Sequence, residues 1–387
     1  MKYALQKIFK NISFYFRRTD IILWFITALT STYCLILLFS VSRISPKYTY
    51  FSKQLFAIII GYIGAFLITM IDYRVIVKHW KFIGSFCLIL LIITIIFGQT
   101  VSGSNGVNAR AWLILPGGIS FQASELAKIG FMITFSKHLT YLKETQKIDS
   151  FLNILGLLAH ALIPMGIAQI QGDTGAAIIF FFMFLIMSFS AGVKLRYFVI
   201  LISSIIIMLP FAWNFILSDY QKERILALVD PSLDPFVSRY QQLQGEISIG
   251  SGKLFGRGLF NGPRVAMESV PIQESDFIFS VAGEELGFIG CILIILLLLA
   301  LLIRVFQIAL KSCDNIGMYI CFGFFGMIAS QTIFNLGMCL SLLPVMGVTL
   351  PFFSYGGSSM ACIYFGIGLI QNVYMYKDDT DTAMLNS

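Results

Sequence analysis

Apolar runs of roughly the length of a membrane-spanning helix recur along almost the whole chain. A helix needs about 20 apolar residues to cross a bilayer, and continuous apolar runs satisfy their backbone hydrogen bonds there as helices. The fourth run is the shortest, because Glu125 and Lys128 interrupt it. The pattern predicts ten spans, approximately Ile21–Val41, Gln54–Ile71, Phe82–Gly98, Ser124–Phe135, Phe151–Ile170, Ala176–Ala191, Tyr197–Leu217, Phe277–Ile303, Gly317–Met338 and Met360–Tyr374.

The composition indicates the same class of protein. Of 387 residues, 57% are hydrophobic and only 12% are charged, whereas a soluble globular domain has roughly 25% charged residues. We therefore predict an all-α integral membrane protein with a single polytopic domain over residues 1–387. No segment is long and polar enough to form a separate soluble domain.

Basic residues indicate the orientation, since Lys and Arg near span ends are retained in the cytoplasm. With ten spans, the main basic turns fall on one side, which predicts that both termini lie in the cytoplasm. The loop with Arg43, Lys47 and Lys53 is the exception. The cytoplasmic parts would be a basic arm over residues 1–20, a short tail over 376–387, and turns with Arg74, Lys78, Lys81, Lys137, Lys143, Lys147, Lys194, Arg196, Arg304 and Lys311.

The formal net charge of +7 follows from this basic face and suits anionic membrane lipids. It does not require nucleic acid as a partner. The seven cysteines form no CxxC pair, which predicts neither a disulfide framework nor a zinc site. No small-residue cleavage pattern follows the first apolar run, so we expect no cleavable signal peptide.

Three longer segments are predicted on the outer face: about Gln99–Ala123, the connection 218–275 and Cys339–Ser359. The connection 218–275 is far longer than the usual ~12–15 residues of a loop, which argues for a function or for local structure. Its "IGSGKL" is not a phosphate loop, because Ile247 and Leu254 stand where glycine and Ser or Thr are needed.

Four stretches carry a family resemblance: "ARAWLILPGGISFQASELAK" from Ala109, "YQQLQGEISIGSGKLFGRGL" from Tyr240, "SDFIFSVAGEELGFIG" from Ser275 and "LPVMGVTLPFFSYGGSS" from Leu343. Because these four motifs occur in this order in a chain with ten predicted spans, the chain resembles the shape, elongation, division and sporulation (SEDS) family. Among its branches, "IGSGKLFGRGL" favours the elongation (RodA-like) branch over the division (FtsW-like) and sporulation branches.

The resemblance implies a multi-pass protein of the bacterial cytoplasmic membrane, a peptidoglycan glycosyltransferase that polymerises lipid II on the outer face of that membrane. The implied partners are a class B penicillin-binding protein and other elongation or division proteins. It also implies that Asp276 is catalytic, within "PIQESDF". Ile272, Glu274 and Ser275 depart there from the family's Glu, His and Thr. Milder departures are Asn108, Ala123 and "QGDTG" from Gln171.

The chemistry supports a carboxylate base. A sugar hydroxyl must attack an anomeric carbon whose leaving group is a lipid pyrophosphate, and a partly desolvated carboxylate at the end of a span can take the proton. The alternative role for Asp276 is an N-cap of the eighth span, since Ser and Asp are favoured there; Ser275 could supply that cap instead.

A cationic clamp for the pyrophosphate is also expected, because Arg bonds phosphate bidentately. Arg110 and Lys128 are the first candidates, although Arg110 beside Trp112 could be an interfacial anchor. Further candidates for substrate contact are Arg224, Arg257, Arg264 and Gln244. A divalent cation, Mg²⁺ or Mn²⁺, could bridge the pyrophosphate with Asp276, Glu274 and Asp234, although no metal-ligand spacing is visible.

Charged residues inside spans are costly and usually face a cavity or a partner. Glu125 lies three residues from Lys128, so a local pair is one interpretation. Glu284 and Glu285 lie at a similar depth in the eighth span. We predict a polar cluster of Lys128, Glu284 and Glu285, with Glu125 beside it, lining a cavity.

The stretch "SYGGSS" interrupts the apolar pattern before the tenth span. Ser358 and Ser359 are predicted to cap that helix, and Gly356 and Gly357 to turn the chain with positive φ. The same amides could form an anion nest. Candidate cavity residues are Ser354, Tyr355 and Ser358.

Two other classes of function fit many of these features. Lys128, Asp173, Glu284 and Glu285 could line the path of a flippase or transporter for a lipid-linked sugar, although no inverted repeat is apparent. A non-catalytic scaffold of the wall-building complex would instead tolerate Asp276→Asn.

Overall fold

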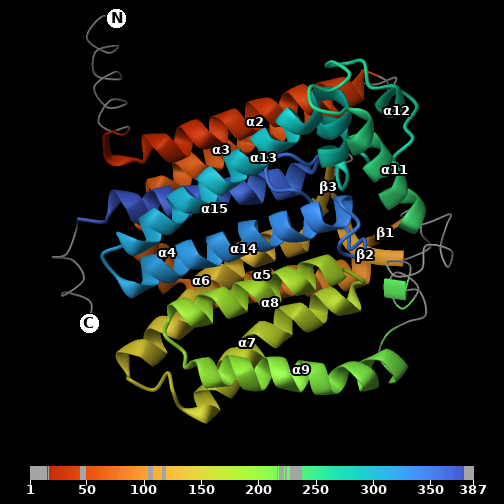
Figure 1. The fold of residues 1–387 in the computed structure, drawn as a ribbon. Helices are drawn as coiled ribbons and strands as arrows, with labels where there is room; N and C mark the ends of the chain where they lie inside the picture. The colour runs from red at the N-terminus through yellow and green to blue at the C-terminus, as the bar shows by residue number, and fades with distance from the viewer. Residues whose placement is uncertain are drawn as a thin grey trace, which may run out of the picture.

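The computed structural model describes residues 15, 17–43, 49–102, 108–115, 119–215, 217, 222, 225–226 and 238–378. Long helices dominate it and run up and down through one bundle (Figure 1). The long helices are α2 (Ile21–Ser42), α3 (Thr49–Thr69), α5 (Trp80–Phe97), α6 (Ala123–Glu144), α7 (Phe151–Ile170), α8 (Thr174–Ser190), α9 (Leu195–Phe215), α13 (Ile278–Leu310), α14 (Asn315–Cys339) and α15 (Gly357–Met375).

Each of the ten predicted spans overlaps one of these helices. By length and composition, six helices in the described part of the chain could cross a membrane, and Thr174–Ser190 and Leu195–Phe211 are shorter apolar helices. Large apolar side chains such as Phe82 and Ile207 are exposed on the outside of the bundle, as contact with lipid requires. The helical multi-pass membrane fold is confirmed, while the count of ten spans stays a prediction.

The two ends of the bundle differ in character. At one end lie α11 (Ser238–Ser251), α12 (Pro263–Ala266) and three strands, and we call it the sheet end (Figure 1). At the opposite end α2 begins and α15 ends; because the predicted basic turns that connect the helices also lie there, we call it the basic end. The segments 1–20 and 376–387 lie mostly outside the described residues.

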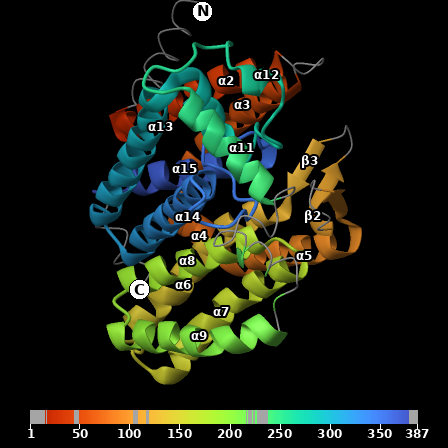
Figure 2. The ribbon, with the colours of Figure 1, turned by 45° about the vertical axis from the view of Figure 1, so that its right-hand side comes forward.

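A small sheet replaces the loop expected between the third and fourth spans. Strands β1 (Gln99–Ser102), β2 (Asn108–Leu115) and β3 (Ile119–Gln122) pair antiparallel in the order β1-β2-β3. Trp112 on β2 pairs with Gln99 on one side and with Gln122 on the other. Figure 2 shows β2 and β3 beside the end of α5. The sheet leads directly into α6, so it positions the first residues of that helix.

Close backbone approach holds α15 against α3 near the centre of the bundle. A Cβ atom at Gly368 would lie 2.8 Å from the Cα and carbonyl oxygen of Ala65, which only a glycine avoids. On the α3 side, Gly61 and Gly64 face Tyr364 and Phe365. Small residues at such crossings let membrane helices pack tightly, where the hydrophobic effect contributes little.

A kink divides α13 at Gly287, whose φ of 67° and ψ of −161° are not helical. The carbonyl oxygens of Glu284 and Glu285 therefore lie outside the regular helical ladder. They accept hydrogen bonds from the backbone N–H groups of Arg257 (2.9 Å) and Gly258 (3.0 Å). The glycine-rich "IGSGKLFGRGL" thus closes over the kink and satisfies its backbone.

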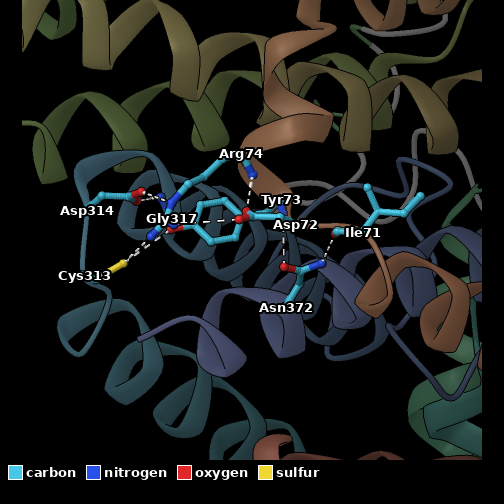
Figure 3. A network of polar contacts seen from close by, with 8 residues as sticks. All are labelled: Ile71, Asp72, Tyr73, Arg74, Cys313, Asp314, Gly317 and Asn372. Atoms are coloured by element: carbon cyan, nitrogen blue, oxygen red, sulfur yellow. Dashed lines mark hydrogen bonds and ion pairs between the residues drawn. The ribbon is translucent and has the colours of Figure 1, made fainter. Parts of the chain in front are cut away.

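A clasp of polar contacts joins three connections at the basic end (Figure 3). Arg74, in α4 (Tyr73–Lys78), donates to Asp314 (3.1 Å) and to the Cys313 sulfur (2.9 Å) ahead of α14. Asn372 of α15 accepts from the Tyr73 N–H at 3.1 Å. The clasp therefore ties the turns after α3 and α13 to the end of α15.

Candidate functional site

Asp276 lies at the sheet end, in the turn that precedes α13, and its side chain is half-buried. The Ser275 hydroxyl donates to its Oδ1 at 3.1 Å. The backbone carbonyl of Asp276 accepts from the Asn335 amide at 2.9 Å and from the Cys339 thiol at 3.5 Å. Asn335 also donates to the Val348 carbonyl at 2.8 Å. Helix α14 thus holds the backbone of Asp276 and the loop before α15 together.

Neither Asp276 nor Ser275 is the N-cap residue of α13. The helix begins at Ile278 and its N-cap is Phe277, with no side-chain cap hydrogen bond. The Ser275 hydroxyl donates to Asp276 instead.

The stretch around "SYGGSS" packs directly on the segment that carries Asp276. The Ser354 hydroxyl donates to the Ser275 carbonyl and accepts from the Leu350 N–H, and the Tyr355 N–H donates to the Glu274 carbonyl at 2.8 Å. Burial, and next the nearby Glu274 carboxylate, raise the pKa of Tyr355. Ser354 and Tyr355 hold the site in place through their backbone and hydroxyl contacts.

The predicted cap and turn at this stretch are wrong in detail. Helix α15 begins at Gly357 after the N-cap Gly356, without a side-chain cap. Ser358 instead accepts from the Gln122 N–H at 3.2 Å, which ties α15 to β3. Gly356 has an extended φ of 172°, and neither it nor Gly357 is among the described residues with left-handed φ.

Lys128 pairs with Glu125, and not with the glutamates of α13. The Lys128 ammonium lies 2.8 Å from the Glu125 carboxylate, one turn away on α6, and both side chains are buried. The ion pair therefore lies inside the bundle, close to the sheet end where α6 begins.

Glu284 and Glu285 find other partners, so the predicted cluster with Lys128 is wrong. The Glu284 carboxylate accepts from the backbone N–H groups of Arg264 (2.8 Å) and Val265 (3.1 Å). Glu285 accepts from the Ser40 hydroxyl at 2.6 Å. The connection between α11 and α13 therefore binds Glu284, and α2 binds Glu285, whereas Lys128 pairs within α6.

The basic candidates are distributed over the sheet end. Arg264 of α12 contacts Gln244 of α11 through its guanidinium, and its Nε donates to Ser248 at 3.2 Å. Helix α11 packs on the first turns of α13, where Gly245 faces Phe277 and Ser280. Arg264 and Gln244 therefore lie beside the helix that follows Asp276.

The remaining arginine candidates are less closely held. Arg110 on β2 has an exposed side chain, and its N–H donates to the Gln171 carbonyl at 2.9 Å. Arg257 is exposed, with its Nε 3.4 Å from the Ser251 hydroxyl. Arg224 lies outside the described residues, as does most of the first part of the 218–275 connection.

Asp173 acts as a structural cap between helices. Its carboxylate accepts from the Gln122 amide (2.8 Å) and the Ser124 hydroxyl (3.0 Å) at the start of α6. Its other oxygen accepts from the Ala176 N–H at 2.9 Å and caps α8. These contacts fix the α6 turn that carries Glu125.

Two buried amides were missed by the sequence reasoning. Asn335 is one, and Gln54 of α3 is the other: it donates to the Ser354 carbonyl at 3.1 Å and accepts from the Gly356 N–H at 3.1 Å. Both side chains have no exposed surface. A polar residue inside an otherwise apolar span was the available signal.

Among the described residues, no three histidine, cysteine or acidic side chains converge to hold a metal ion. Asp276 and Glu274 alone do not form a cation site. Asp234 lies outside the described residues, so the Mg²⁺ or Mn²⁺ ion stays a prediction.

These features define a helical multi-pass membrane protein with a polar site at one end of its bundle. The family model for FtsW, RodA and SpoVE, described as cell cycle protein, matches residues 20–379. The chain belongs to this family, which is the SEDS family that its motifs resemble.

Known proteins from several branches are similar to the chain. It is 35% identical to the stage V sporulation protein E of Bacillus subtilis over 371 residues, 92% of this chain and 97% of that protein. It is 31% identical to the peptidoglycan glycosyltransferase MrdB of Escherichia coli K12 over 291 residues, 75% and 76% of the two chains. Since probable FtsW enzymes of Geobacter also match, the assignment of the chain to the elongation branch stays a prediction.

Solved structures share the fold. A chain from the structure titled "Structural coordination of polymerization and crosslinking by a peptidoglycan synthase complex" matches with a TM-score of 0.78 and 27% identity. The Thermus thermophilus rod shape determining protein RodA matches with a TM-score of 0.68 and 26% identity. Both matches cover 93% of this chain and 98% of the other.

Proposed function

We propose that this protein is a peptidoglycan glycosyltransferase that polymerises lipid II, with Asp276 as the general base. The family and the names of its relatives support the reaction class. The observation that carries the role of Asp276 is structural: its backbone is held by Asn335 and Cys339, and its side chain is half-buried at the sheet end. A rigidly held backbone that positions a partly desolvated carboxylate is what a general base requires.

The proposed step is a single displacement. Asp276 takes the proton of the acceptor hydroxyl as its oxygen forms a bond to the anomeric carbon of the donor. The bond from that carbon to the lipid pyrophosphate breaks, and the pyrophosphate leaves with the electron pair. Attack opposite the leaving group inverts the anomeric centre, so the step needs no glycosyl-enzyme intermediate.

Basic side chains at the sheet end would stabilise the charge on the departing pyrophosphate. Arg264, held by Gln244, and the exposed Arg110 and Arg257 are the described candidates. Lys128 is engaged with Glu125 at 2.8 Å, so we assign this pair to holding the shape of the site. Arg224 and a divalent cation remain part of the proposal, and activity after EDTA treatment and readdition of Mg²⁺ or Mn²⁺ tests the cation.

The proposed orientation places the sheet end at the outer face of the cytoplasmic membrane and the basic end in the cytoplasm. Lipid II would enter from the membrane. A class B penicillin-binding protein, with other elongation or division proteins, would be the partner that cross-links the product. A structure of a peptidoglycan synthase complex among the similar folds supports this assignment.

The decisive experiment compares wild type with Asp276→Asn, using purified protein, the candidate penicillin-binding partner with its transpeptidase blocked, and labelled lipid II. We expect a glycan ladder from wild type and at least a ~100-fold loss in the variant, the lower range for general-base catalysis. Glu268→Gln, an exposed carboxylate in the same connection, is the matched control.

Equal glycan ladders from wild type and Asp276→Asn would show that Asp276 is not the general base. The absence of a ladder from either protein, with intact folding and partner binding, would favour the scaffold function. Lipid II translocation into liposomes under those conditions would favour the flippase function.

A further inference from the structure

A groove on the side of the bundle is separate from the proposed catalytic site. It lies between α5, α6 and α7 and has a volume of about 550 Å³, within the roughly 300–1,000 Å³ of ligand pockets. Gly84, Gly130 and Gly156, one from each helix, line it, and Gly156 leaves open space, with His138 at 3.9 Å from the place of a Cβ atom. We call it the α5–α7 groove.

The groove has the depth of one membrane leaflet. On α5 it extends from Trp80, the first residue of the helix, to Leu91. Eleven residues of helix span about 16 Å at 1.5 Å each, close to half of the ~30 Å hydrocarbon core. Because α5 begins at the basic end, the lining residues Trp80 and Lys81 lie there, at the opposite end of the bundle from Asp276.

The mouth of the groove carries a positive charge. Lys81 lines it with an exposed side chain, and its ammonium lies 5.7 Å from the centre of the Trp80 ring. Lys81 makes no ion pair within the described part of the chain. A tryptophan beside a lysine is the usual arrangement at a membrane surface, so the ammonium lies at the depth of lipid phosphates.

The interior of the groove suits a hydrocarbon chain. Its polar lining side chains are Ser85, Thr134 and His160, and the protein engages the last two: His160 Nε2 lies 3.1 Å from the Thr134 hydroxyl, and Nδ1 lies 3.2 Å from Nδ1 of His138. The other walls are largely apolar and include Leu88 and Ile163. An apolar channel that ends at an unpaired cation fits a ligand with a hydrocarbon tail and an anionic head.

We propose that the α5–α7 groove binds an anionic phospholipid of the leaflet at the basic end. Its phosphate lies at Lys81 and one acyl chain occupies the groove between Gly84 and Gly156. Under the proposed orientation this is the cytoplasmic leaflet. The lipid would stay bound between α5, α6 and α7 in the cytoplasmic half of the protein. The site is independent of the reaction at Asp276.

The test uses the full chain in nanodiscs with phosphatidylglycerol that carries a photoreactive group in the middle of one acyl chain. Mass spectrometry should locate cross-links in residues 84–91 and 156–164. Lys81→Glu should lower phosphatidylglycerol cross-linking by about fivefold, the effect of one basic residue near anionic lipid. Lys147→Glu, which changes an exposed lysine in the turn after α6 that does not line the groove, is the control.

A second pair of variants tests the groove itself. Gly156→Leu places a side chain in the groove and should abolish the cross-links, because the position has only His138 nearby at 3.9 Å. Gly166→Leu is the control. Gly166 lies on the same helix but does not line the groove, and a Cβ atom added there has no neighbour within 4 Å. The Gly166→Leu protein should therefore still form the cross-links. Both proteins are first compared with wild type in thermal unfolding.

Several outcomes would overturn the proposal. A phosphatidylcholine probe could cross-link as much as the phosphatidylglycerol probe, or the yield could be unchanged in Lys81→Glu. Either result would show that the groove binds acyl chains without preference for the headgroup. Another such outcome is an unchanged yield in folded Gly156→Leu. Displacement of the probe by polyprenyl pyrophosphate would assign the groove to the tail of the substrate carrier instead.

Discussion

Asn335 connects the backbone of Asp276 to the loop before α15. Its amide donates to the carbonyls of Asp276 and Val348, which are 59 and 13 residues away in sequence. The side chain is completely buried, so no water can replace these bonds without rearrangement. One amide group therefore holds both backbone segments together.

Asn335→Leu should lower thermal stability and polymerase activity together. It removes the Asn335 bond to the buried Val348 carbonyl and leaves the Asp276 carbonyl with the Cys339 thiol, and an unmade buried hydrogen bond costs about 1–3 kcal/mol. Asn335→Asp is the informative companion, because an ionised carboxylate donates no hydrogen bond and a protonated one donates a single bond. We expect its activity relative to wild type to rise as the pH of the assay falls.

The measurement is the pH profile of glycan polymerisation for both variants, with thermal unfolding at each pH. A relative activity of Asn335→Asp that does not change with pH would argue that Asn335 has only a packing role. If Asp276→Asn is also fully active, the proposed function fails first, and the two results are therefore distinguishable.

At the scale of elements, the kink in α13 shapes the sheet end. Gly287 has a backbone conformation that is nearly restricted to glycine. A Cβ atom there would lie 2.2 Å from the N atom of Gly256, in the segment that closes over the kink. The positions of Glu284 and of α12 depend on this packing.

Gly287→Ala should therefore destabilise the protein by at least about 1–3 kcal/mol. Gly250→Ala is the matched control, because a Cβ atom at that position of α11 has open space; it should be neutral or stabilise the helix by up to about 1 kcal/mol. Thermal unfolding in one detergent compares the two. Equal stability of both variants would contradict the strain assigned to Gly287.

At the scale of the whole molecule, each end has its own polar contacts. The basic end is closed by the clasp of Figure 3 and by the ion pair between Arg304 of α13 and Asp20 at the start of α2. The sheet end holds Asp276 under the loop before α15. Helices that cross between them are joined chiefly by apolar packing.

Arg74→Ala should destabilise the fold by about 1–3 kcal/mol, because Asp314 and the Cys313 sulfur lose a charged donor. Lys78→Ala, an exposed lysine on the same short helix, should stay within about 0.5 kcal/mol of wild type. Activity per folded molecule should be the same in both, because the clasp lies at the end opposite Asp276. Thermal unfolding and a polymerase assay on the folded fraction test this, and a loss of activity in folded Arg74→Ala would show that the two ends are coupled.

The amino-acid sequence by itself determined the membrane class and the helices, because the length of an apolar run is a local property that decides how a segment meets a bilayer. It also indicated Asp276 and the family through collinear motifs. Only the tertiary structure decided which groups are in contact. Lys128 pairs with Glu125 of its own helix, Glu284 accepts hydrogen bonds from α12, and Asn335 donates to the carbonyl of Asp276. Those contacts depend on the Gly287 kink and on chain segments that are distant in sequence. The same reason applies to the sheet at Gln99–Gln122, whose strands are short, and to the groove, which exists only where three helices meet.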